Sequence, residues 1–113
     1  MTKVVFYERD DKLMTGFEAA GHAGYAKRGQ DIVCAAVSAL TQAAANGLSE
    51  VVKANLEARM DEDTGYLSCM LTNANSEDVI EKSQILLKTL KMALTEISKD
   101  YPGTIRIIIR ERR

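Results

Sequence analysis

Residues 31–52, with the sequence DIVCAAVSALTQAAANGLSEVV, decide the fold because they form the clearest long helix pattern in the chain. Apolar side chains recur there at spacings of three and four residues, the period of one buried face of an α-helix. Asp31 suits the N-cap position, since its carboxylate accepts hydrogen bonds from the free amides of the first turn. The stripe expected to face the core consists of Val33, Val37, Leu40, Ala44, Leu48 and Val51.

A second face of this helix is also apolar or small, and it carries Ile32, Ala36, Ala43 and Gly47. A helix with two such faces usually packs on two sides. One side is expected to meet a sheet, and the other to meet a second helix or a partner subunit.

Strand patterns lie on both sides of the helix. Residues 3–9 are rich in β-branched and aromatic types, and residues 13–19 alternate after a short turn, which predicts a hairpin. After the helix, residues 55–60 and 66–71 alternate around another turn and predict a second hairpin.

A second helix and a last strand complete the pattern. Asn75 or Ser76 suits the N-cap of this helix, Pro102 and Gly103 end it, and residues 104–109 alternate as a strand. The order ββαββαβ predicts an α+β two-layer sandwich, a mostly antiparallel sheet with both helices on one face, in one domain over residues 1–113. The core stripe expected on the second helix is Val79, Leu86, Leu90, Ala93, Ile97 and Tyr101.

Composition is that of an ordinary globular protein, with 46% hydrophobic and 27% charged residues. The formal net charge of −1 provides no field that attracts nucleic acid, so no direct nucleic-acid binding is expected. The apolar run at residues 4–7 is too short for a signal peptide, and we expect no membrane segment. A cytoplasmic location with two reduced cysteines follows as the expectation.

Cys34 and His22 suggest a thiol hydrolase. Cys34 lies in the first turn of the expected helix, and His22, the one histidine of the chain, precedes it on a glycine-rich loop. A thiolate is the reactive form of cysteine, and a neighbouring histidine is the group that usually generates it. The alternative is a buried thiol beside an unrelated loop histidine, because free cysteine often packs in cores.

Other residues near this pair have two interpretations each. Asp31 either orients the imidazole, caps the helix, or does both. Ser38 shares the helical face of Cys34 and either donates to substrate or thiolate or is merely solvated. The free amides of the helix start, that of Cys34 included, are expected to bind an oxyanion.

Neither metal nor cofactor is expected. A structural zinc site needs four ligands, and one histidine with two distant cysteines does not supply them. The second cysteine, Cys69, lies in the middle of a strand on its apolar face, so it is predicted to belong to the core.

The stretches Gly21-His22-Ala23 and DIVCAAVS at residues 31–38 resemble the motifs of the ribosomal-processing cysteine protease family, Prp, and the similarity extends over the whole chain. This resemblance implies a protease that removes the N-terminal extension from the precursor of large-subunit ribosomal protein twenty-seven. It also implies a homodimer. By the resemblance His22 is the general base and Cys34 the nucleophile, and the remaining motif positions of the site are Gly21, Asp31 and Ser38.

Two further hypotheses remain open. A ribosome-associated binding module without catalysis is the main alternative, supported by the basic tail of Arg106, Arg110, Arg112 and Arg113. The glycine-containing loop at residues 24–29 is also a candidate lid that orders over a bound peptide.

Overall fold

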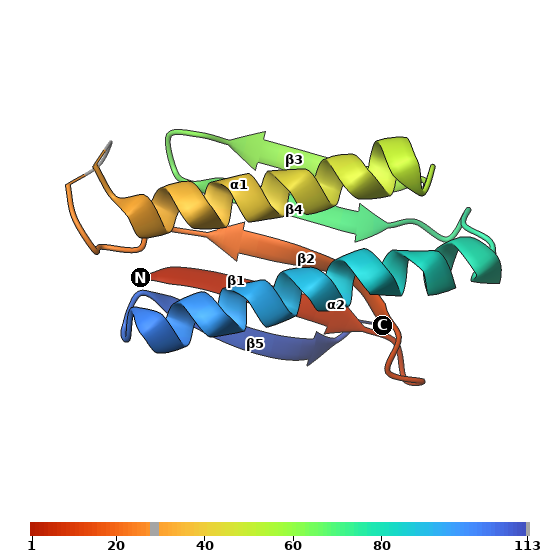
Figure 1. The fold of residues 1–113 in the computed structure, drawn as a ribbon. Coiled ribbons are helices and arrows are strands. Elements are labelled where there is room, and N and C mark those ends of the chain that lie inside the picture. Colours follow the sequence, from red (N-terminus) through yellow and green to blue (C-terminus); the bar gives the residue numbers. More distant parts are fainter. Residues whose placement is uncertain (28–29, 113) are drawn as a thin grey trace.

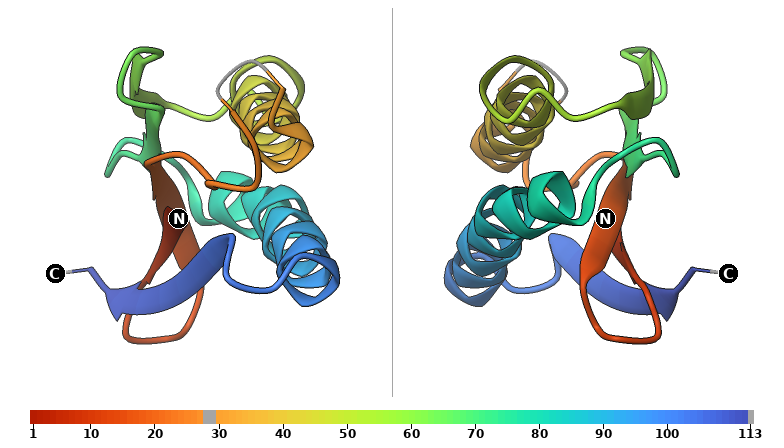
Figure 2. Two further views of the ribbon diagram at one scale, coloured as in Figure 1. Left: turned by 90° about the vertical axis from the view of Figure 1, so that its left-hand side faces the viewer. Right: turned by 90° about the vertical axis from the view of Figure 1, so that its right-hand side faces the viewer.

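A computed structural model describes residues 1–27 and 30–112 of the chain. Two helices lie on one face of a five-stranded sheet of order β3-β4-β2-β1-β5 (Figures 1 and 2), which confirms the predicted α+β fold and its ββαββαβ order. With η1 counted as the continuation of α1, the expected element ends differ from the observed ones by at most two residues. The elements are β1 (Thr2–Glu8), β2 (Met14–Ala20), α1 (Ile32–Asn46), η1 (Gly47–Val51), β3 (Leu56–Asp61), β4 (Tyr66–Leu71), α2 (Glu77–Asp100) and β5 (Ile105–Glu111).

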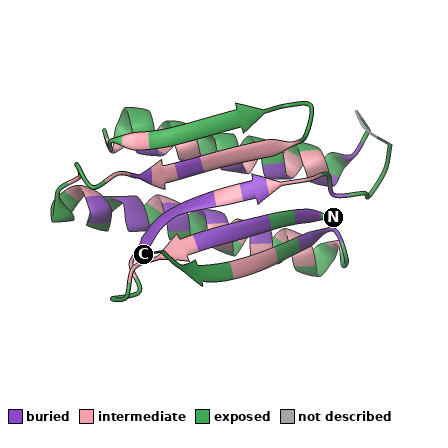
Figure 3. Cartoon of the chain, turned by 180° about the vertical axis from the view of Figure 1, so that it is seen from behind, coloured by how far each residue is buried: buried purple, intermediate pink, exposed green. Residues whose placement is uncertain are grey.

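Three of the four strand pairs in the sheet are antiparallel, and β1 pairs with β5 in parallel. Figure 1 shows that the start of β1, the end of β2, the β3–β4 turn and the start of α1 all lie at the same end of the molecule. Seen from the face opposite the helices (Figure 3), the edge strand β3 is exposed along most of its length. The antiparallel pairing therefore brings two connecting segments to the N-terminus of α1.

Gly47 explains how the two helices approach each other. A Cβ atom at this position would lie 2.9 Å from Cδ1 of Leu86 on α2, so the missing side chain of Gly47 makes room for the end of Leu86. The second helix is thus one confirmed neighbour of the small face of α1. Ile32 on that face is 56% exposed, and a partner subunit there stays a prediction.

The buried face of α2 differs from the predicted stripe. Ile80, Leu87 and Leu94 are buried on α2, whereas Leu86 and Ile97 are only partly buried. The sequence was misleading because two polar residues, Ser83 and Gln84, also lie on the buried face. The stripe predicted for the first helix was wrong at its end, since Val51 on η1 is 80% exposed, and it omitted Thr41 on α1, which is buried.

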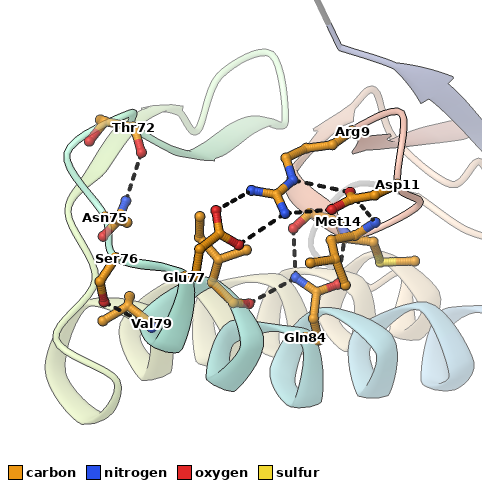
Figure 4. Close-up of polar contacts among 11 residues, drawn as sticks. Arg9, Asp11, Met14, Thr72, Asn75, Ser76, Glu77, Val79 and Gln84 are labelled. Atoms are coloured by element: carbon orange, nitrogen blue, oxygen red, sulfur yellow. Dashed lines mark hydrogen bonds and ion pairs between the residues drawn. The ribbon is translucent and has the colours of Figure 1, made fainter.

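Gln84 belongs in the core because its amide completes the backbone of β2. Its Oε1 accepts from the Met14 amide at 2.7 Å, and its Nε2 donates to the Met14 carbonyl at 2.8 Å (Figure 4). Nε2 also donates to the carbonyl of Ile80 at 2.9 Å. A buried polar side chain is tolerated where its hydrogen bonds are satisfied in this way.

Arg9 joins the β1–β2 hairpin to the first turn of α2, at the end of the sheet away from the α1 N-terminus. Its guanidinium pairs with Asp11 at 2.6 Å and with Glu77 at 3.0 Å (Figure 4). Hydrogen bonds from Arg9 hold the pKa of both carboxyl groups below their ordinary values. These exposed pairs connect the hairpin to α2, contribute little to stability, and take no part in the pocket described next.

The continuous helical stretch Ile32–Val51 is long and apolar enough to cross a membrane by length and composition alone, with a mean hydropathy of 1.3. The expectation that no segment would meet this criterion was therefore wrong. Val33, Val37 and Leu48 on this stretch are buried in the core cluster with residues of the sheet. Core helices meet the same criterion, so the criterion does not by itself indicate a membrane protein.

Candidate active site

All five residues that the sequence predicts for the site line one pocket at the N-terminus of α1. The pocket has a volume of about 370 Å³. Ala19 on β2 and Leu67 on β4 contribute apolar surface to its walls. The residues thus brought together are Gly21, His22, Asp31, Cys34 and Ser38.

The Cys34 sulfur contacts the loop that precedes the helix. The backbone N–H of Ala23 donates to Cys34 Sγ at an N–S distance of 3.0 Å. Ala23 itself is buried, and Cys34 is half-buried. A charged acceptor takes part in stronger hydrogen bonds than a neutral one, so this amide stabilises the sulfur most when it carries negative charge.

Asp31 caps α1 and anchors the same loop. Its Oδ1 accepts from the amides of Val33 at 2.9 Å and Cys34 at 3.0 Å, and its Oδ2 accepts from Tyr25 at 2.9 Å and Ala26 at 3.3 Å. Burial acts to raise the pKa of Asp31, but the backbone amides and the Cys34 side chain outweigh it and hold the pKa below its ordinary value. Of the two predicted roles, the cap is confirmed.

These caps overturn the expectation about the oxyanion donors. The amides of Val33 and Cys34 are used by the Asp31 side chain, and the amide of Ala35 donates to the Asp31 carbonyl. The same amides cannot serve an oxyanion while they serve the cap. In the described part of the chain, the Ala23 amide is the backbone group that donates to the Cys34 sulfur.

The loop after His22 has a second anchor. The rings of Tyr25 and Tyr101 meet edge to face, with their centroids 5.1 Å apart. Tyr101 is the C-cap of α2, so this contact connects the loop to the second helix. The predicted lid extends over Arg28 and Gly29, which lie outside the described residues.

His22 is exposed, and its ring lies against the β3–β4 turn. An ideal Cβ atom placed on Gly65 would be 3.0 Å from Cε1 and 3.3 Å from Nδ1 of the imidazole. Within residues 1–27 and 30–112, no hydrogen bond joins the His22 ring to Cys34 or Asp31. In substrate-free enzymes such contacts are often long and tighten only when substrate binds.

Ser38 and Cys69 lie in surroundings that differ from those of the candidate pair, Cys34 and His22. The Ser38 hydroxyl accepts from Nε2 of Gln42 at 2.7 Å, on an exposed part of α1. Cys69 is fully buried, burial raises the pKa of its thiol to about 11, and its predicted place in the core is confirmed. In the described part of the chain, no group of three or more His, Cys, Asp or Glu side chains is arranged to hold a metal ion.

The β3–β4 hairpin contributes pocket residues that sequence reasoning did not single out. They include apolar and acidic side chains as well as the turn glycine. The turn itself could be predicted from the sequence. That it faces the loop of Gly21 and His22 follows only from the pairing of β4 with β2. These residues are Met60, Asp61, Glu62, Gly65 and Tyr66.

We expect Asp31→Asn to loosen the loop and to change the acid dependence of stability, because the amide group cannot accept all four hydrogen bonds. The low folded-state pKa of Asp31 means that its stabilisation is fully present above the unfolded-state pKa. This stabilisation is lost as the pH falls through the folded-state value. Melting temperatures measured from neutral to acidic pH should therefore fall less steeply in Asp31→Asn than in the wild type.

Asp10→Asn is the control for this measurement, since Asp10 is an exposed aspartate in the turn after β1. It should reproduce the acid dependence of the wild type. The same slope in all three proteins would contradict the role assigned to Asp31.

Comparison with known proteins gives one consistent result. The family model described as "Cysteine protease Prp" matches residues 1–106. The ribosomal processing cysteine protease Prp of Bacillus subtilis (strain 168) is 32% identical over 109 residues, covering 95% of this chain and 96% of the relative. The protein of that name from Staphylococcus aureus (strain Mu50 / ATCC 700699) is 26% identical over 98 residues, covering 87% of this chain and 89% of the relative.

Solved structures agree with the sequence comparisons. The essential ribosomal processing protease Prp from S. aureus, in complex with a covalently linked product peptide, has a TM-score of 0.84 at 25% identity, covering 96% of this chain and 99% of that chain. SMU.848 from Streptococcus mutans has a TM-score of 0.81 at 28% identity, covering 99% of this chain and 96% of that chain.

Proposed function

Because the chain belongs to the cysteine protease Prp family, we propose that it removes the N-terminal extension from the precursor of large-subunit ribosomal protein twenty-seven. It is a cysteine protease by family and by its named relatives. The relatives are called ribosomal processing proteases, and the S. aureus protein has been crystallised with a covalently linked product peptide. In this proposal the pocket binds a peptide segment of a ribosomal protein and positions it for cleavage.

Cys34 is the nucleophile and His22 the general base in the mechanism we propose. His22 takes the thiol proton, and the sulfur forms a bond to the carbonyl carbon of the scissile peptide while the π electron pair moves to oxygen. The protonated His22 then donates its proton to the leaving amine, and the C–N bond breaks to leave a thioester. His22 then takes a proton from a water molecule as that water adds to the thioester carbon, the C–S bond breaks to release the carboxylic acid, and the proton returns to the Cys34 sulfur.

The contact between the Ala23 amide and the Cys34 sulfur carries this proposal. When sulfur adds to a carbonyl, negative charge develops on the oxygen two bonds away. A donor that already touches sulfur is placed to reach this oxygen, which is the requirement for oxyanion stabilisation. Asp31 supports the arrangement, since it holds the loop that carries Ala23 against the start of α1.

The pocket volume suits a few residues of an extended peptide, since ligand pockets usually measure roughly 300–1,000 Å³. The proposed place of action is the cytoplasm, with residues 1–113 acting as one catalytic domain in a homodimer. The exposed face of α1 supports the dimer, because Ile32 is 56% exposed there and Ala35, Ala39 and Ala43 are also exposed.

The test is incubation with a peptide that spans the junction between the extension and the mature ribosomal protein. We expect mass spectrometry to find one cut at the junction, and none in a peptide with the junction residues scrambled. Absence of a cut in both the peptide and the full-length precursor, with folded protein, would overturn the proposal. Salt-sensitive RNA binding by the same sample would then favour the non-catalytic ribosome-associated module.

A further inference from the structure

Gly65 is under two separate constraints. Its φ of +66° lies in the left-handed region that L side chains rarely adopt. In addition, a Cβ atom at this position would lie 2.8 Å from the carbonyl oxygen of Gly21 and 3.0 Å from Cε1 of His22. The left-handed turn explains only the first constraint, whereas the second concerns the loop that carries the catalytic histidine.

Gly103 is a turn glycine that has the backbone constraint of Gly65 but not the steric one. Its φ is +80°, yet a Cβ atom there would meet nothing within 4 Å. The two glycines therefore share the backbone requirement and differ in their surroundings. At Gly65 the space that a side chain would fill is occupied by the imidazole ring and the backbone before it.

Among residues 1–27 and 30–112, no polar group fixes the orientation of the His22 ring. Neither Asp31 nor Cys34 forms a hydrogen bond with it in the described part of the chain. A general base must nevertheless be held within hydrogen-bond reach of the proton that it takes. On one side the ring lies against the β3–β4 turn, and this contact restricts its movement toward Gly65.

The turn is a rigid support because the sheet fixes it relative to β2. Leu67 on β4 pairs with Ala19 on β2, two residues before Gly21. The hydroxyl of Tyr66, the residue after Gly65, donates to Oε2 of Glu18 at 2.7 Å. Both connections join the segment after the turn to β2, the strand that precedes His22, so the turn has a fixed place beside the loop that carries the ring.

We propose that Gly65 is a positioning residue for His22, its missing side chain leaving the space in which the imidazole lies during proton transfer. The inference rests on the proposed function, since it takes His22 as the general base. An added methyl group must move either the ring or the turn. Small misplacements of reacting groups can lower rates by about 100-fold.

The experiment compares Gly65→Ala with Gly103→Ala, which introduces the same strained backbone where a Cβ atom has room. We expect Gly65→Ala to lower kcat for the junction peptide by about tenfold or more with little change in KM, since the base rather than the binding surface is displaced. Gly103→Ala should retain the wild-type kcat. Equal kcat values for folded Gly65→Ala and Gly103→Ala would overturn the inference.

Two measurements separate positioning from a general loss of structure. In a His22→Ala background, Gly65→Ala should cause no further loss of the residual rate, and an equal loss there would overturn the inference. Because the chain has one histidine, its Cε1–H group gives a single NMR signal, which should shift in Gly65→Ala and not in Gly103→Ala. An unchanged signal in Gly65→Ala would also overturn the inference.

The NMR measurement keeps this inference distinguishable from the proposed function. If the wild type cuts no substrate, the proposed function fails, while the signal of His22 still reports its contact with residue 65. If the wild type cuts the peptide and Gly65→Ala cuts it equally well, only the positioning role fails.

Discussion

Replacement of Cys34 by alanine should lower the rate of peptide cleavage by about a thousandfold or more, because the step that forms the thioester then has no nucleophile. Cys69→Ala is the matched control within the same chain. Cys69 is fully buried in the core, and its thiol has a pKa raised to about 11, so it supplies no thiolate at neutral pH. Turnover per folded molecule should stay close to that of the wild type in Cys69→Ala.

Rates on the junction peptide, measured beside melting temperatures, distinguish chemistry from stability. Cys34→Ala leaves the Ala23 amide without its acceptor and removes the side-chain hydrogen bond between Cys34 and Asp31, so we expect a modest fall in its melting temperature and no loss of the fold. Cys69→Ala leaves a small cavity in the core and should melt lower, since buried truncations destabilise proteins. If Cys34→Ala kept most of the activity, the thiol mechanism would be wrong.

The sequence predicted most of the fold because its local patterns agree with the tertiary contacts. The spacing of Val33, Val37 and Leu48 marks the core face of α1 and its continuation η1, and all three are buried. The strands were predicted within two residues, since their alternation matches a sheet with one face covered by helices. The Asp31 cap was also predictable, because the carboxylate and the amides that it accepts from lie within three residues.

Long-range contacts set the limit of this reasoning. The buried face of α2 depends on Gln84, whose partner Met14 lies 70 residues away along the chain, and no local periodicity records that bond. The oxyanion donors were predicted wrongly for a related reason. The capping carboxylate competes for the same amides, and only the structure shows that the cap uses them.

The candidate site also contains residues that local sequence identifies and residues that only long-range contacts identify. His22 and Cys34 stand close in sequence and carry recognisable chemistry, so a sequence motif identifies them. Gly65 has no functional group, and it meets His22 only because β4 pairs with β2. It contributes to the pocket by having no side chain, and the importance of this can be recognised only from the position of the His22 ring in the structure.

Replacement of His22 by alanine should lower kcat by about 100- to 10,000-fold, the usual range for the loss of a general acid–base group. Some activity should remain, because the Cys34 sulfur and the Ala23 amide that touches it are unchanged. The loss should be smaller than that of Cys34→Ala, in which the bond-forming atom itself is missing. Peptide cleavage by both variants, measured at equal concentrations of folded protein, gives this comparison.

Free imidazole should partly restore the activity of His22→Ala, and this rescue separates a proton-transfer role from a structural one. The His22 side chain is exposed and lines the pocket, so its removal leaves a space that opens to solvent. Added imidazole can enter that space and take the thiol proton, whereas Cys34→Ala has no thiol to deprotonate. A rate increase in His22→Ala but not in Cys34→Ala is therefore the expected result. If imidazole failed to increase the rate in a folded His22→Ala protein, or if His22→Ala were as active as the wild type, His22 would not be the base.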